Sequence, residues 1–162
     1  MAKFIDAIES DRLYFRGIEE KDADLIVKWR SDPKVYRYFK SAHKISKDEH
    51  VNWYKNTYLN NINRYDWMCF ERTTSKRIGV FGIVVDGDSA EVNYLLSPDA
   101  QHKGYAKEGV INIIEYAKSK WSIKHVFAEI HIDNKPSIDL AERIGFIKSK
   151  CDGDFLLYRF EV

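Results

Sequence analysis

The feature that most constrains the fold is an apolar run that passes through a short polar loop directly into an amphipathic helix. Residues 92–96 read as a strand, and residues 97–107 carry the pattern Gln101-x-x-Gly104-x-Ala106. A helix N-terminus presents backbone N–H groups without intrahelical partners, and its dipole adds about half a positive charge. Small residues leave that backbone accessible. The junction therefore predicts a site for a phosphate or pyrophosphate.

The rest of the chain alternates between strand and helix patterns without a repeat or a linker, which predicts one domain. Further strands are expected at residues 13–18, 65–72, 77–85, 90–96, 123–132, 146–150 and 155–160. Helices are expected at residues 22–30, at 46–58, after Gly104 and at 137–144. This order predicts an α/β (α+β) fold with a single mixed, mainly antiparallel sheet flanked by about four helices.

Composition excludes several classes of function. The chain has 162 residues, with 26 Lys and Arg against 25 Asp and Glu, so it lacks the basic excess typical of nucleic-acid binding. No apolar run approaches a membrane span, and the N-terminus does not resemble a signal peptide. Cys69, Cys151 and the five histidines show no metal-ligand spacing. We expect reduced thiols, no metal and a cytoplasmic protein.

From about Arg12 to its C-terminus the chain resembles the GNAT superfamily of acetyl-CoA-dependent N-acetyltransferases. The resemblance rests on residues 93–98 leading into 101–106, on Asn134-x-x-Ser137 at the start of a later helix, and on residues 141–146 that close it. It implies a GNAT fold with splayed fourth and fifth strands. Residues 12–60 would face the acceptor, and residues 90–146 would hold acetyl-CoA as co-substrate. An amine would attack the thioester directly in a ternary complex.

The resemblance also implies how the cofactor is held. Backbone N–H groups of residues 101–106 would bind the pyrophosphate, the strand at 95–96 would pair with the pantetheine amides, and Asn134 would bond the same arm. Lys103, Lys107 and His102 would either meet the 3′-phosphate or remain solvated. The expected cofactor contacts are Leu95, Leu96, Ser97, Gln101, His102, Lys103, Gly104, Tyr105, Ala106, Lys107, Asn134 and Ser137.

The catalytic groups are less evident. Many GNAT members place a tyrosine acid where this chain has Ala141, so Ser137 becomes the candidate acid; alternatively it is only a helix N-cap. Glu129 is the candidate base because it lies opposite the aliphatic face of its strand, and Glu91, at the start of the preceding strand, is the other candidate. Both glutamates are also readable as surface charges.

The N-terminal half should select the acceptor. The sequence around Trp29-Arg30 and His50-x-x-Trp53 resembles a GNAT subgroup that acts on nucleotide-linked 4-amino-4,6-dideoxy sugars of pseudaminic-acid synthesis. Arg30 would bind a diphosphate and His50 would add a hydrogen bond, or else both residues have structural roles. The alternatives are a ribosomal-protein-type N-terminal acetyltransferase and a non-catalytic acetyl-CoA-binding domain. Either a monomer or a homodimer is expected.

Overall fold

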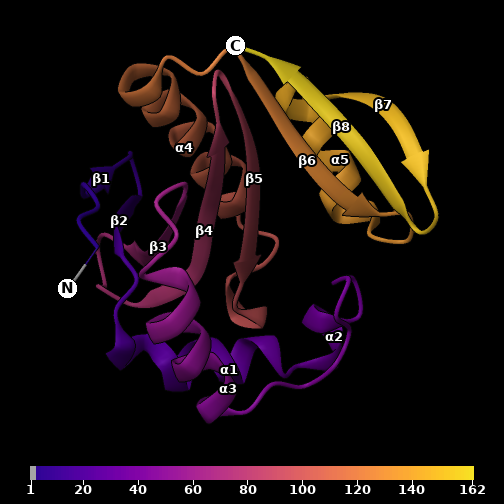
Figure 1. The fold of residues 1–162 in the computed structure, drawn as a ribbon. Helices are drawn as coiled ribbons and strands as arrows, with labels where there is room; N and C mark the ends of the chain where they lie inside the picture. The colour runs from indigo at the N-terminus through magenta and orange to yellow at the C-terminus, as the bar shows by residue number, and fades with distance from the viewer. Residues whose placement is uncertain (1–2) are drawn as a thin grey trace.

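A computed structural model describes residues 3–162 and shows one continuous sheet of eight strands in the order β1-β2-β3-β4-β5-β6-β8-β7 (Figure 1). Neighbouring strands are antiparallel except for β5 and β6. The strands are β1 (Ile8–Glu9), β2 (Leu13–Gly17), β3 (Arg64–Glu71), β4 (Arg77–Asp86), β5 (Ser89–Leu96), β6 (His125–His131), β7 (Ile147–Asp152) and β8 (Phe155–Glu161).

Helices cover both faces of this sheet. They are α1 (Ala23–Arg30), α2 (Pro33–Tyr36), α3 (Lys47–Trp53), α4 (Tyr105–Trp121) and α5 (Lys135–Ile144). The apolar stripe of α4, which includes Val110, Ile113 and Ala117, is buried as its spacing predicts. None of the helices in residues 3–162 combines the length and apolarity needed to cross a bilayer.

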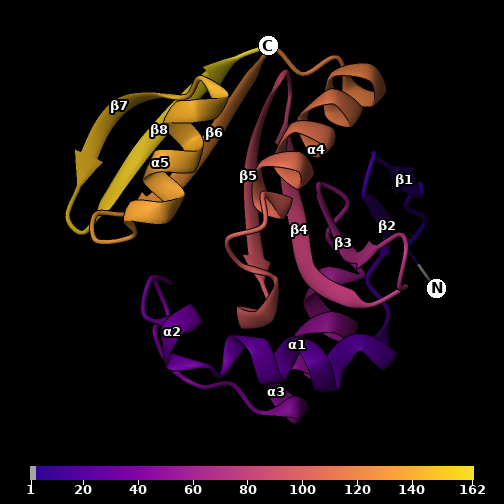
Figure 2. The ribbon, with the colours of Figure 1, turned by 180° about the vertical axis from the view of Figure 1, so that it is seen from behind.

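Two apolar cores hold the layers together. On one face, seen in front in Figure 2, α4 and α5 pack on the central strands around Phe81, Ile113 and Val126. On the other face, α1 packs on Met68 of β3 through Ile26 and Trp29. The sheet therefore has a well-filled face under α4 and α5 and a second face on which α1 and α3 cover only part of the strands.

The parallel pair β5–β6 is short and then opens. Register pairs join only residues 89–91 of β5 to residues 125–127 of β6. Beyond Glu91 the two strands diverge into a wedge, which Figures 1 and 2 show between β5 and β6, with α2 near its open end. The predicted splay of neighbouring central strands is confirmed, and its vertex lies beside Glu91.

The predicted strands are all present, with bounds shifted by a few residues. Two elements were not predicted, β1 and α2, because two residues and a single turn are too short for a periodic pattern. Pro33 ends one helix and also begins the next, whose cap is Asp32. The helix expected at residues 46–58 is α-helical only to Trp53 and continues as a π-helical turn over Tyr54–Tyr58.

Candidate active site

The polar loop before α4 has the backbone of an anion site. Gly104 is the N-cap of α4 with a φ of 80°, and His102 has a φ of 63°. The left-handed backbone at these two residues turns N–H groups of the loop toward one side, and no side chain caps the helix start. Residues 101–104 are exposed. Apart from the Gln101 N–H, which donates to the Pro98 carbonyl oxygen at 3.5 Å, the loop therefore leaves its N–H groups available at the positive end of a 17-residue helix.

Hydrogen bonds of Arg12 and Glu108 hold this loop in place. The Glu108 carboxylate accepts hydrogen bonds from the Arg12 backbone N–H at 2.8 Å and from Arg12 Nε at 2.7 Å. Arg12 in turn donates to the carbonyl oxygen of Lys103 at 2.9 Å. These contacts could not be predicted from the sequence because Arg12 and Glu108 are 96 residues apart. They fix the loop without using the N–H groups that would hold a phosphate.

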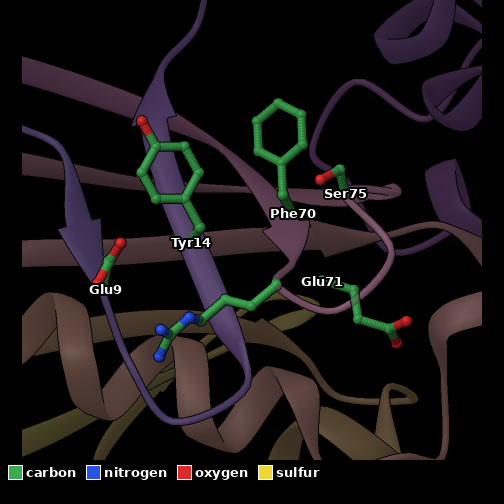
Figure 3. A pocket seen from close by; sticks show the side chains of 6 residues that line it. Glu9, Tyr14, Phe70, Glu71 and Ser75 are labelled. Atoms are coloured by element: carbon green, nitrogen blue, oxygen red, sulfur yellow. The ribbon is translucent and has the colours of Figure 1, made fainter.

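A second contact fixes the first residue of α4. The Tyr105 side chain is buried and its hydroxyl donates to Glu71 on β3. Glu71 also lines a cavity of about 310 Å³ between β1, β2 and β3, together with Glu9, Tyr14 and Phe70 (Figure 3). Tyr105 thus anchors the helix to the sheet through its side chain, and only its backbone remains for the predicted cofactor role.

One edge of β5 is left without a strand partner in the wedge. Residues 92–96 of β5 pair with β4 on one side but have no strand partner on the side of β6. Their outward backbone groups therefore lie in a wedge that leads to the loop at residues 101–106. An extended ligand with amide groups could complete this edge as an added strand. Leu95 and Leu96 lie on this segment, and Ser97 follows it, buried.

Ser137 and Asn134 lie at the start of α5, across the wedge from β5. The helix cap is Asn134, whose side-chain oxygen accepts from the Ser137 N–H at 3.4 Å. The alternative reading of Ser137 as the N-cap is therefore wrong. Its hydroxyl instead accepts a hydrogen bond from the Tyr94 hydroxyl at 3.2 Å. Tyr94 lies on β5, so this bond bridges the two sides of the wedge.

Tyr94 is not among the site residues predicted from the sequence. It stacks on Phe81 with ring centroids 5.8 Å apart, and burial raises the pKa of its hydroxyl despite the bond to Ser137. It therefore stays protonated and able to donate at neutral pH. The buried Ala141 offers no hydroxyl, so Ser137 and Tyr94 supply the O–H groups at this end of the wedge.

The candidate bases lie at the wedge vertex, on the face away from α4. Glu129 forms an ion pair with Lys40, and both line a cavity of about 490 Å³ beside β6 and β8. Glu91 lies on β5 directly opposite Phe127 of β6. Burial and the neighbouring charge of Glu129 raise the pKa of Glu91. The two carboxylates thus lie on the same face, and the raised pKa makes Glu91 a stronger proton acceptor than an ordinary glutamate.

Arg30 and His50, expected at the acceptor site, come together between α1 and α3. His50 is buried and Arg30 half-buried, and Arg30 Nε and His50 Nε2 have no hydrogen-bond partner in the described part of the chain. Burial and the charge of Arg30 lower the pKa of His50, while burial and the charge of Arg64 lower the pKa of Arg30. The Arg30 guanidinium stacks over Phe39, 5.1 Å from its ring centroid.

The splayed sheet, the exposed loop at the α4 N-terminus and the hydroxyl pair at α5 form the arrangement expected of an acyltransferase that uses a phosphate-bearing thioester cofactor. A profile of the acetyltransferase (GNAT) domain matches residues 12–147. The chain therefore belongs to the GNAT family of acetyl-CoA-dependent N-acetyltransferases, as the motifs predict.

Several curated proteins are similar to this chain. The chain is 28% identical to the uncharacterized protein MJ1062 of Methanocaldococcus jannaschii, over 88% of this chain but 29% of that longer protein. It is 27% identical to the uncharacterized N-acetyltransferase p20 of Bacillus licheniformis, covering 89% of this chain and 84% of p20. It is 25% identical to the acetyltransferase PseH of Campylobacter jejuni, covering 87% of each chain.

Solved structures show the same fold at lower identity. A spermidine N-acetyltransferase from Vibrio cholerae, in complex with CoA and spermine, superposes with a TM-score of 0.83 over 94% of this chain and 96% of that chain, at 18% identity. RimL, a ribosomal L7/L12 α-N-protein acetyltransferase in complex with CoA, also gives 0.83, over 97% and 98%, at 16% identity.

Proposed function

We propose that this protein transfers the acetyl group of acetyl-CoA to the amino group of a nucleotide-linked amino sugar. The choice of acceptor rests on the environment of the Arg30 guanidinium. Arg30 is half-buried, its Nε is buried without a hydrogen-bond partner, and no carboxylate in residues 3–162 forms an ion pair with it. A half-buried cation without a counter-ion favours an anionic ligand, and a diphosphate is the anion that its planar donors match.

The surroundings of Arg30 support a nucleotide diphosphate. Arg64 lies close enough to lower the pKa of Arg30, and it stacks over Trp53, 5.0 Å from the ring centroid. His50 adds an unbonded ring nitrogen, and its ring contacts the same Trp53 at 5.6 Å between centroids. Two guanidinium groups, an imidazole and aromatic faces together suit a charged, flat ligand.

Acetyl-CoA supplies the activated thioester for this reaction. The loop at residues 101–106 would bind its pyrophosphate through backbone N–H groups, and residues 95–96 would pair with its pantetheine arm. A strand N–H at the wedge would then stabilise the oxyanion that develops during attack. Ser137 would donate a proton to the departing sulfur, with Tyr94 orienting its hydroxyl.

The acceptor amine needs little help to lose its proton if it is a sugar amine. Removing a proton from a lysine-like amine of pKa ~10.4 at pH 7 costs about 4.6 kcal/mol, against about 1 kcal/mol for an amine near pKa 8. Glu91 and Glu129, at the wedge vertex, would serve as proton acceptors. Two exposed or half-exposed carboxylates suit the less basic class of amine.

A protein N-terminus is the second candidate acceptor. Its α-amine also has a pKa near 8, and the Asn134-x-x-Ser137 pattern resembles the ribosomal-protein branch. A chain that binds acetyl-CoA without turnover is a third outcome, suggested by Ala141 in place of the usual tyrosine.

The test is acetyl-CoA turnover, measured as released thiol, over a UDP-linked 4-amino sugar, ribosomal N-terminal peptides and spermidine. Preferential turnover of the sugar nucleotide, lost in Arg30→Gln, would support the proposal. Turnover of peptides or spermidine alone would overturn the assigned acceptor. If calorimetry shows that acetyl-CoA binds but none of these amines is acetylated, the proposed transfer reaction is refuted and a domain that binds acetyl-CoA without catalysis is favoured.

A further inference from the structure

Three residues lie side by side across β3, β4 and β5, on the face of the sheet away from α4. Asp66, Gly82 and Asn93 are direct register partners. A Cβ atom placed on Gly82 would lie 2.2 Å from Asp66 Oδ1 and 2.8 Å from Asn93 Oδ1. Both oxygens therefore lie against the Cα of Gly82 and within about 5 Å of each other. Any larger residue at position 82 would displace them.

One of these oxygens is buried without a partner. The Asp66 side chain is only 4% exposed, and its Oδ2 accepts a hydrogen bond from Arg64 Nε at 3.1 Å. Across residues 3–162 no group donates to Oδ1. The backbone of Asp66 is fixed separately, because its N–H donates to the buried Tyr58 hydroxyl at 2.9 Å. A buried carboxylate oxygen without a donor is destabilising, which favours a ligand that supplies one.

The residues around Asp66 Oδ1 indicate which kind of donor group a ligand would have to supply. Two oxygen acceptors over a glycine repel an anion and attract a cationic N–H group. Asn93 is exposed and lies on the splayed part of β5, so the pair is adjacent to the wedge on the side where Glu91 and Glu129 also lie. Burial raises the pKa of the Asp66 carboxyl, while the charges of Arg64 and Lys3 oppose that rise.

We propose that Asp66 and Asn93 form the recognition site for the acceptor's amino group, a subsite that deepens the proposed acetyltransferase function and rests on it. The ammonium donates to Oδ1 of both residues once the exposed Asn93 side chain turns aside to admit it. The nitrogen then loses two protons. The first passes to Asp66 before attack. The second passes to Glu91 as the C–N bond forms and the C–S electron pair departs on sulfur. The sulfur takes up the hydroxyl proton of Ser137, and Ser137 then regains a proton from solvent, to which Asp66 and Glu91 release theirs.

The first test observes Asp66 directly. The protein is labelled with carbon-13 at aspartate carboxyl groups, and the Asp66 signal is assigned by its loss in Asp66→Asn. With CoA present, we titrate the UDP-linked 4-amino sugar, its 4-hydroxy analogue, an N-terminal peptide and spermidine. An amine that binds should move the Asp66 signal and lower its apparent pKa, whereas the hydroxy analogue should leave it in place.

The second test uses kinetics. Asp66→Asn removes both a hydrogen-bond acceptor and the acceptor of the first proton, so it should raise KM, lower kcat and reduce kcat/KM for the accepted amine about 10- to 100-fold. Asn93→Ala should reduce kcat/KM by a similar factor mainly through KM, and both variants should keep their acetyl-CoA affinity. Asp86→Asn, an exposed carboxylate at the end of β4, is the matched control and should behave as wild type. Thermal unfolding with and without CoA shows whether each variant is folded.

The outcomes separate the two proposals. If spermidine or a peptide moves the Asp66 signal and is acetylated while the sugar is not, the sugar acceptor is refuted and the amine subsite stands. If an amine is acetylated without moving the Asp66 signal, or if a folded Asp66→Asn variant keeps its KM, the subsite is refuted. If no amine of the panel binds or reacts, both proposals are refuted.

Discussion

The Tyr94–Ser137 hydroxyl pair allows a prediction whose size follows from the geometry. Tyr94→Phe removes one neutral hydrogen bond of 3.2 Å and leaves the buried ring and its stacking on Phe81 intact. A bond of this kind is worth about 1 kcal/mol, so loss of the orientation of Ser137 should lower kcat about fivefold. Ser137→Ala removes the donor itself and should lower kcat about 10²-fold or more.

The double variant separates a coupled pair from two independent groups. If Tyr94 acts only through Ser137, Tyr94→Phe in the Ser137→Ala background should cost nothing further, and the two effects should be strongly non-additive. The assay is single-turnover thiol release with saturating amine and acetyl-CoA, which reports the chemical step. Fully additive effects, or a kcat unchanged in Ser137→Ala when chemistry limits the rate, would refute the reasoning.

Three other perturbations test separate parts of the molecule. Gly104→Val should abolish acetyl-CoA binding by calorimetry, because a β-branched side chain strains a residue at φ 80° and covers the loop N–H groups; retained affinity would contradict the loop assignment. Arg30→Gln should raise the KM for the sugar nucleotide at least tenfold and leave acetyl-CoA affinity unchanged; an unchanged KM would place the diphosphate elsewhere. Asp22 is buried, but its bonds to Arg16 and the Glu19 N–H outweigh burial and lower its pKa. The ionised Asp22 therefore stabilises the folded state above the unfolded pKa near 4, and this contribution is lost as pH falls through the lower folded pKa. In Asp22→Asn, the free energy of unfolding should fall less steeply over this acid range than in the wild type.

The fold was predictable because its long elements carry strong periodic patterns. The stripe on α4 and the alternation in β6 required only local reading. The π-helical turn at Tyr54–Tyr58 was not predictable, because its stability depends on stacking of Tyr58 with Trp53 and Tyr54, and not on spacing.

The candidate site was predictable where one segment carries it. The loop at residues 101–106 is local, whereas Tyr94 and Asp66 become candidates only through partners distant in sequence. Tyr94 meets Ser137 across 43 residues, and Asp66 meets Asn93 over the bare backbone of Gly82. The one visible signal was Gly82 itself, since a glycine inside a strand often marks close approach by other groups.

The short parallel junction of residues 89–91 with 125–127 has a consequence for how the chain unfolds. On one side lie β1 to β5, and on the other β6, α5, β7 and β8 form a smaller unit. Few strand pairs join them, so the smaller unit should open in local fluctuations that leave the larger part intact. A ligand bonded to β5 and to the start of α5 would link the two units and make their opening a single cooperative event. Amide exchange in β6 and β8 should therefore slow on CoA binding far more than exchange in β3, although neither strand needs to touch the ligand.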